Sequence, residues 1–254
     1  MIIAQISDTH ILARSSEQSE GQRRADNLRC CVADINRQRP DAVVHTGDMV
    51  QHGLAQEYEY LREILAPLEA PLYVIPGNRD KRDALRAAFG DHAYLPEDGD
   101  FLHYTVETHP LRLVALDSTA AGERKGVYCP QRQAWLNGVL GCAADKPTVL
   151  LIHHPPFDID DHYIGGYRRP EEAADLASVV NQHPQVLRLL CGHVHCPTRR
   201  SWAGTQATTM ASVAVDVRKG IDETQAKGRP IYQLHSTSDQ AGLISQARIV
   251  TGDQ

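Results

Sequence analysis

Features that would direct a protein to a membrane or to nucleic acid are missing from these 254 residues. No apolar run approaches the about 20 residues that a membrane-spanning helix needs. The chain has 26 Lys and Arg against 32 Asp and Glu, so its formal net charge is −6 and no basic patch for a nucleic-acid polymer is expected. No targeting segment is visible before the first apolar run, which begins at Ile2. We therefore expect a cytoplasmic protein that binds neither a membrane nor a nucleic-acid polymer.

Linkers and paired cysteines are missing as well. No stretch rich in Pro, Gly or Ser is long enough to separate two domains, which predicts a single domain over residues 1–254. The six cysteines show no paired spacing: Cys30 and Cys31 are adjacent, and Cys191 ends an apolar run. A disulfide framework is therefore not expected, and a reduced cytosolic protein is the simplest interpretation.

What the sequence does contain is a repeated pattern of six short apolar runs, each followed by a polar residue able to bind a metal ion. The runs are Ile2–Ile6, Ala42–Val44, Leu72–Ile75, Leu111–Leu116, Thr148–Ile152 and Val186–Leu190. Continuous aliphatic runs of this length are typical of buried parallel strands, and open α/β sheets bind ligands beyond the carboxyl ends of their strands. The polar residues should therefore converge on one edge.

Seven residues that follow these apolar runs carry oxygen or nitrogen donors that suit Mn, Fe, Co or Zn ions. They are Asp8, His10, Asp48, Asn78, His153, His193 and His195. Seven donors are too many for one ion, so we expect two divalent or trivalent ions that share a carboxylate. Asp48 is the expected bridge, because Gly47 before it lets the backbone turn tightly and direct the carboxylate between the two ions.

Five motifs in a fixed order make the chain resemble the calcineurin-like metallophosphoesterases, and within them the class III cyclic nucleotide phosphodiesterases. The motifs are Asp8-x-His10, Gly47-Asp48-x4-Gly53, Gly77-Asn78-x-Asp80, His153-His154-Pro155-Pro156 and Gly192-His193-x-His195. Each motif alone is weak evidence, but all five in family order, each after a predicted strand, form a specific signal. The resemblance implies a four-layer α/β/β/α sandwich of two mixed sheets, whereas periodicity alone indicates only an α/β protein.

The resemblance also implies how the donors are divided between the two ions. One metal would be held by Asp8, His10 and His195, the other by Asn78, His153 and His193, and Asp48 would join them. Such a pair of ions lowers the pKa of a bridging water and stabilises both the attacking and the leaving oxygen at phosphorus. The expected reaction is hydrolysis of a small phosphodiester, a 3',5'-cyclic nucleotide by resemblance, by a metal-bridging hydroxide.

One residue departs from the family pattern. This branch usually has histidine after the asparagine, where it contacts the phosphate and can protonate the leaving group, but this chain has Arg79. Arginine stays protonated and its planar fork matches phosphate oxygens, so we expect Arg79 to bind the phosphoryl group without acting as an acid. A metal-bound water or another histidine would then protonate the leaving group, and His154 is the nearest in sequence. Two structural alternatives stay open: Arg79 paired with Asp80 or Asp83, and His154 bonded to a backbone carbonyl.

Residues near the motifs are expected to support the site. The polar segment Phe157–Tyr167 follows the fourth motif and is expected either to cover the site and contact substrate or to form an exposed connection. Asp117 is expected to orient a metal ligand by hydrogen bonding. Asp80 is expected to cap the helix that follows it, and Gly90 to end that helix.

Three functional hypotheses follow. A phosphodiesterase with a small-molecule substrate leads, and a phosphomonoesterase acting on a nucleotide or sugar phosphate gains some support from the positive charge of Arg79. A scaffold without catalysis conflicts with the complete set of metal donors, and the acidic composition argues against a nuclease. Related proteins pair through elements near the substrate segment, so a homodimer stays open, although no exposed apolar stripe requires one.

Overall fold

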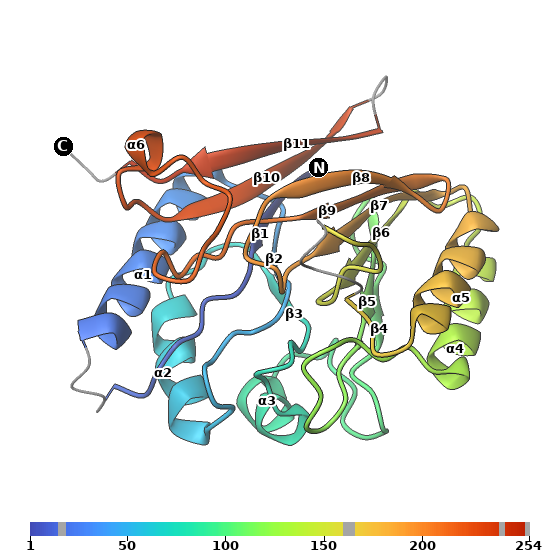
Figure 1. Cartoon of the computed structure of the whole chain (residues 1–254), viewed down its shortest axis with the longest axis horizontal. Helices are drawn as coiled ribbons and strands as arrows, with labels where there is room; N and C mark the ends of the chain where they lie inside the picture. Colours follow the sequence, from blue (N-terminus) through green and yellow to red (C-terminus); the bar gives the residue numbers. More distant parts are fainter. Residues whose placement is uncertain (15–18, 160–165, 239–241, 252–254) are drawn as a thin grey trace.

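The computed structural model describes residues 1–14, 19–159, 166–238 and 242–251 and arranges its strands in two mixed sheets (Figure 1). The first sheet has the order β11-β10-β1-β2-β3. Its strands are β1 (Ile2–Ile6), β2 (Ala42–His45), β3 (Leu72–Val74), β10 (Ile231–Ser238) and β11 (Gly242–Ile249). Strands β1, β2 and β3 are parallel, whereas β10 pairs antiparallel with both β1 and β11.

The second sheet has the order β4-β5-β6-β7-β9-β8. Its strands are β4 (Tyr104–Val106), β5 (Arg112–Leu116), β6 (Thr148–Ile152), β7 (Val186–Cys191), β8 (Thr198–Trp202) and β9 (Thr205–Thr209). Strands β5, β6, β7 and β9 are parallel, and the two edge strands β4 and β8 are antiparallel to their neighbours. All six apolar runs of the sequence therefore form strands.

A pair of helices covers the outer side of each sheet (Figure 1). The helices are α1 (Ser19–Gln38), α2 (Ala55–Leu65), α3 (Arg82–Phe89), α4 (Pro130–Gly141), α5 (Pro170–Asn181) and the short α6 (Glu223–Ala226). Apolar residues of α1 and α2 pack with the first sheet, and those of α4 and α5 pack with the second. Pro130 and Pro170 each occupy a first helical turn, where a missing N–H costs nothing. The predicted α/β/β/α sandwich is confirmed.

Two cores fill the space between these layers, and strand β5 shows how the sequence divides its residues between them. Leu113 and Ala115 point into the core shared by the two sheets, while Val114 and Leu116 point toward α4 and α5. All four side chains are fully buried. Burial on both faces explains why the run is continuously aliphatic, and it stabilises the fold by roughly 1.5–3 kcal/mol for each large side chain.

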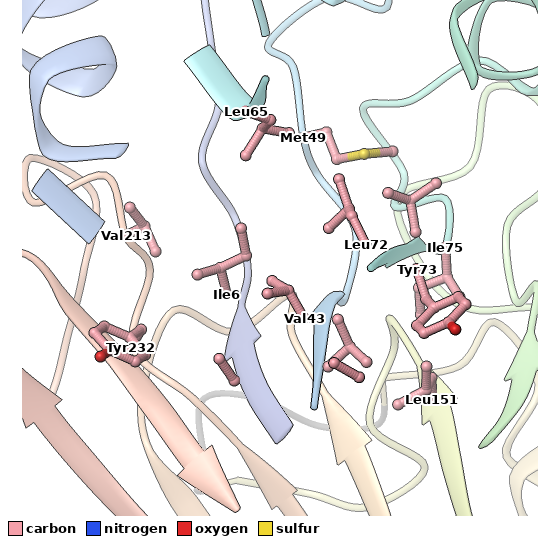
Figure 2. Close-up of a cluster of buried hydrophobic side chains, with 14 of the residues drawn as sticks. Ile6, Val43, Met49, Leu65, Leu72, Tyr73, Ile75, Leu151, Val213 and Tyr232 are labelled. Carbon is pink, nitrogen blue, oxygen red and sulfur yellow. The ribbon is translucent and has the colours of Figure 1, made fainter. Parts of the chain in front are cut away.

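The core between the sheets joins strands that are far apart in sequence. Figure 2 shows Ile6, Val43 and Leu72 of the first sheet in the same cluster as Leu151 of the second. This packing brings the carboxyl ends of β1 and β2 to the same end of the molecule as those of β6 and β7. The loops after these strands are thereby held near one another.

Tyrosine side chains cover the open edge of β3. The Val74 N–H donates to Tyr94 Oη at 3.2 Å, and Tyr104 Oη donates to the Val74 carbonyl at 2.7 Å. A neighbouring strand would normally supply such bonds. The tyrosines therefore satisfy the backbone N–H and carbonyl of Val74 and limit the pairing of this edge with other chains. They also fix the strand end that leads to Asn78.

All six cysteines are free thiols, in line with the lack of paired spacing. Within the described ranges, no helix combines the length and the apolar character needed to cross a bilayer.

Candidate metal centre

The loops after β1, β2, β3, β6 and β7 bring the seven predicted donors together. Ligand atoms of Asp8, His10, Asp48 and His195 all lie within 4.8 Å of one another, and a second group with the same spacing contains His153, His154 and His193. Asn78 adjoins the second group, because its Oδ1 lies 3.3 Å from His153 Nε2. The structure thus gathers donors from residues 8 to 195 at one end of the two sheets.

The backbone is strained where it delivers these donors. Positive φ angles occur at Asp8 (54°), His10 (47°), Asp48 (51°), His193 (73°) and His195 (58°). Among the other described residues that are not glycine, only Arg39, Ala203 and Lys227 have positive φ. The left-handed region costs about 1 kcal/mol or more for a residue with a side chain. Such strain persists only where the surrounding structure holds it, and here it is concentrated at the predicted donors.

Glycines allow the donor loops to pack more closely than side chains would permit. A Cβ on Gly47, whose φ is +93°, would lie 2.5 Å from His153 Nδ1. A Cβ on Gly77 would lie 2.2 Å from the Asp48 amide nitrogen, and one on Gly192 would lie 2.2 Å from Ser7 Oγ. Real Cβ contacts are not that short, so any larger residue would push the loops apart.

Backbone carbonyls orient two of the histidine rings. His153 Nδ1 donates to the Thr46 carbonyl at 2.8 Å, and His195 Nδ1 donates to the Val217 carbonyl at 3.1 Å. Since a carbonyl only accepts, Nδ1 carries the hydrogen and Nε2 of the neutral ring carries a lone pair. The His195 Nε2 lies 3.3 Å from Asp8 Oδ1, so two acceptors face each other. This is the arrangement by which proteins prepare imidazoles to bind metal.

The carboxylate of Asp48 lies between the two groups of donors. Its Oδ1 is 3.5 Å from His153 Nε2, and its Oδ2 is 3.9 Å from His10 Nε2. Oδ1 also accepts the Arg79 amide N–H at 2.7 Å. One oxygen therefore faces each group, as a bridging ligand requires. Asp48 Oδ1 faces the Nε2 lone pair of His153, and Asp8 Oδ1 faces that of His195; such acceptors repel unless a cation lies between them, so the donor set fits two metal ions.

Burial controls the charge states of these groups. It lowers the pKa of His10 to about 3 and also lowers that of His193, which favours the neutral imidazole that binds metal. Burial also opposes the charged form of Asp8, but the neighbouring His195 outweighs it and the pKa of Asp8 is lowered. Burial likewise opposes the charged form of His195, and Asp8 in turn raises its pKa. A metal ion must therefore compete with a proton at this position.

His154 plays a structural part in this arrangement. It is fully buried, with Nδ1 2.8 Å from Ser118 Oγ and Nε2 donating to the Arg124 carbonyl at 3.2 Å. Burial lowers its pKa well below the usual range. This is the backbone-carbonyl alternative, so both ring nitrogens have protein partners and the ring is poorly suited to act as an acid. Residues 160–165 of the segment Phe157–Tyr167 lie outside the described residues, so its predicted substrate contact stays a prediction.

The predicted role of Asp80 is wrong. Helix α3 begins at Arg82 with Lys81 as its N-cap, although Gly90 follows its last residue as expected. The Asp80 carboxylate instead accepts from the Gly77 N–H (2.8 Å), the Met49 N–H (3.2 Å) and Tyr58 Oη (2.8 Å). Met49 and Tyr58 come from other parts of the fold, and with Gly77 they occupy the carboxylate in place of a local cap. Burial, together with the charge of Asp48, raises the pKa of Asp80 to about 7. Asp80 thus ties the loops after β2 and β3 together.

The predicted role of Asp117 is wrong as well. Its carboxylate binds the Arg82 guanidinium, the Leu102 N–H and the Thr119 N–H and hydroxyl, and none of these groups belongs to a predicted metal donor. Asp117 therefore anchors the first residue of α3 to the end of β5. An ion pair with Arg82, which the sequence pattern did not reveal, replaces the expected contact with a ligand.

Three positively charged side chains help to line a cavity at the donors. A cavity of about 190 Å³ is lined by His10, Asp48, Asn78, Arg79, Arg124, His193, Val194, His195 and Lys219. Among the described residues, no ion pair joins Arg79 to Asp80 or Asp83, and Asp83 pairs with Arg86. Sequence reasoning missed Arg124 and Lys219, because neither lies in a motif or directly after an apolar run. A neighbouring cavity of about 780 Å³ shares Asn78 and Arg79 with the first.

Comparison with known proteins supports a family assignment. The sequence profile of the calcineurin-like phosphoesterase family matches residues 1–197, which include all seven predicted donors. Among curated proteins, the chain is 32% identical over 256 residues to one from Arcobacter nitrofigilis named "Probable glycerophosphodiester phosphodiesterase GpdQ" (98% of this chain, 93% of that protein). It is 30% identical over 248 residues to the "3',5'-cyclic adenosine monophosphate phosphodiesterase CpdA" of Pseudomonas aeruginosa (96% and 88%).

A solved structure with the same architecture is the dimetal phosphatase from Danio rerio. It matches with a TM-score of 0.72 at 16% identity over 100% of this chain and 98% of that one, which supports the fold alone. The profile match, the relatives and the gathered donors agree with one another. The chain belongs to the calcineurin-like phosphoesterases and is a metal-dependent phosphoric ester hydrolase.

Proposed function

We propose that the chain is a phosphodiesterase with two metal ions, each Mn, Fe, Zn or Co. Asp8, His10 and His195 would hold one ion, Asn78, His153 and His193 would hold the other, and Asp48 would bridge them. The observation that carries the proposal is the geometry of Asp48, whose two carboxylate oxygens face imidazole nitrogens of different donor groups. Without a cation between them, Asp48 Oδ1 and the Nε2 lone pair of His153 would repel, and the strain of the left-handed donors would have no evident purpose.

The residues of the chain prepare the site for in-line displacement at phosphorus. When bound, the two ions supply a water of lowered pKa and positive charge for the phosphoryl oxygens. Backbone carbonyls hold the Nδ1–H groups of His153 and His195, which leaves their Nε2 lone pairs available to bind metal. Arg79 lines the cavity beside the donors and binds the phosphoryl group with its guanidinium fork. His154 has no part in proton transfer in this account.

The proposed substrate is a small phosphodiester. A 3',5'-cyclic nucleotide agrees with the motif resemblance and with the name of the Pseudomonas aeruginosa relative, while the name of the Arcobacter nitrofigilis relative adds glycerophosphodiesters to the candidates. Both classes combine one scissile phosphoryl group with a polar alcohol. The cavity of about 780 Å³ next to Asn78 and Arg79 offers room for the part of the substrate that does not react.

One observation favours a second candidate, hydrolysis of a phosphomonoester. Three cationic side chains, those of Arg79, Arg124 and Lys219, line the cavity over the metal donors. A phosphomonoester carries up to two negative charges on the phosphoryl group and would gain more from this positive charge than a diester does.

A panel of substrates tests the proposal. The metal-loaded protein is assayed with 3',5'-cyclic nucleotides, glycerophosphodiesters, bis(p-nitrophenyl) phosphate and mononucleotides, each with added Mn²⁺. We expect turnover of diesters with a kcat/KM above that for monoesters, and its loss in Asn78→Ala. A preference for monoesters would replace the leading proposal by the second candidate, and inactivity toward the whole panel after metal loading would contradict both.

A further inference from the structure

A buried arginine, Arg24, bonds the backbone of one histidine of a proposed metal site and the segment that orients the other. Arg24 projects from α1, is 4% exposed and lines neither cavity described above. Its Nη1 donates to the His10 carbonyl at 3.1 Å and to Gln51 Oε1 at 3.1 Å. His10 has a φ of 47°, so this bond holds the backbone of a strained donor.

The same guanidinium also reaches the segment that orients His195. Its Nε and Nη2 bind the carboxylate of Asp216, with Nη2 2.6 Å from Oδ2, and Nη2 also donates to Glu20. Asp216 precedes Val217, whose carbonyl accepts the His195 Nδ1–H at 3.1 Å. The Lys219 N–H donates back to the His195 carbonyl at 2.8 Å. The ion pair therefore fixes the short segment that sets the orientation of the His195 ring.

All five N–H groups of Arg24 have acceptors, which is the condition under which a buried guanidinium fixes its surroundings. The two histidines that it connects face each other, with Nε2 atoms 3.1 Å apart. The opposite donors depend on other contacts: His153 is held by the Thr46 carbonyl, and Asn78 lies within the turn that the Gly77 N–H bond to Asp80 closes. The hydrogen bonds of Arg24 go to His10, Gln51, Glu20 and Asp216 and to none of these opposite donors.

We propose that Arg24 and Asp216 form a clamp that sets the affinity of only one of the two metal sites, the site of Asp8, His10 and His195. The inference rests on the proposed two-metal function and names the positioning residues of one site. Arg24 does not touch substrate or metal. It acts through the His10 backbone and the Val217 carbonyl, as partners of metal ligands do in other proteins.

The test is a metal titration of the metal-free protein. Calorimetry measures the binding of Zn²⁺, and in a parallel titration with Co²⁺ the hyperfine-shifted imidazole N–H signals in the NMR spectrum report on each site. Wild type should bind two ions. In Arg24→Gln the affinity of one ion should fall about 10- to 100-fold, with loss of the His195 signal, while the other ion binds as in wild type. Asp216→Asn, which keeps the arginine and the shape of its partner, should shift the same site in the same direction.

Arg248→Gln is the matched control, because it removes a different ion pair to α1, the one with Asp34, and leaves every contact of the donors intact. It should lower stability without changing either metal affinity. Equal weakening of both ions in Arg24→Gln, weakening of the Asn78 site alone, or no change would each overturn the clamp. Fewer than two ions in wild type would instead contradict the proposed function.

Discussion

Two buried carboxylates in this protein, Asp34 and Asp48, have opposite surroundings. Asp34 is fully buried on α1 and accepts hydrogen bonds from Tyr232 Oη at 2.7 Å, from Arg37 and from Arg248. Asp48 is 3% exposed and faces the nitrogens of His10 and His153 instead. Burial would raise the pKa of both, but the partners of Asp34 lower its pKa to about 2, whereas that of Asp48 is raised.

The difference separates a carboxylate that stabilises the fold from one whose charge lacks a cationic partner until a ligand binds. The charge of Asp34 is matched within the chain, so its cluster ties α1 to β10 and β11 without any other molecule. The carboxylate of Asp48 accepts one hydrogen bond among the described residues, from the Arg79 backbone N–H, and several neighbouring residues have left-handed backbones. Strain and unmatched charge are expected where a site is built for function and supported by the rest of the fold.

Replacing Asp48 should have the largest effect. Asp48→Asn keeps the shape of the side chain but removes the bridging charge, so kcat for bis(p-nitrophenyl) phosphate should fall about 10³-fold, in the range seen when a single stabilising group is lost. In the presence of a chelator, the free energy of unfolding measured with urea should not fall, because the lost charge had no cationic partner in the chain. A fall of more than about 1 kcal/mol in the metal-free protein would show that Asp48 contributes to folding as Asp34 does.

Replacing Asp34 should give the reverse result. Because its pKa is about 2 in the folded protein and near 4 when unfolded, its charge stabilises the fold above pH 4, and this stabilisation is lost as the pH falls through 2. Asp34→Asn should therefore lower the free energy of unfolding by about 2 kcal/mol at pH 7 and leave kcat unchanged. Urea denaturation across pH 2 to 7 measures this, and the two proteins should converge at the acid end. A constant difference down to pH 2 would refute the ionic explanation.

Arg79→His should have the smallest effect and sharpens the account of proton transfer. Histidine at this position can protonate the leaving group, so log kcat/KM across a series of aryl phosphodiesters should depend less on leaving-group pKa than in wild type. Arg23→His, a change at an exposed position of α1, serves as the surface control and should keep the wild-type slope. Equal slopes for Arg79→His and wild type would remove the proposed distinction between arginine and histidine at this position.

The strands and the gathered donors could be predicted because both depend on local patterns. A continuous aliphatic run such as Thr148–Ile152 predicts a buried strand, and β6 has these bounds. The donors lie directly after such runs, so the parallel arrangement of the strands was enough to predict that they meet. The role of Gly47 could also be predicted, since the tight turn after β2 requires a residue that adopts its φ of +93°.

Other contacts could not be predicted because they depend on residues distant in sequence. Asp80 follows the rule for a helix cap, but the Met49 N–H and Tyr58 hydroxyl bind its carboxylate only once the fold has formed. The ion pair of Asp117 with Arg82 spans 35 positions, and the clamp of Arg24 with Asp216 spans 192. No periodicity or motif marks such pairs, and each of them determines where a loop near the site lies.

The central claim is that two metal ions lie between the donors, bridged by Asp48. Elemental analysis of purified, metal-loaded protein together with anomalous diffraction from its crystals tests it most directly. The account predicts two ions per chain, one beside His10 and His195 and one beside Asn78 and His153, with an oxygen of Asp48 contacting each. An empty site, or a single ion without Asp48 as ligand, would contradict it.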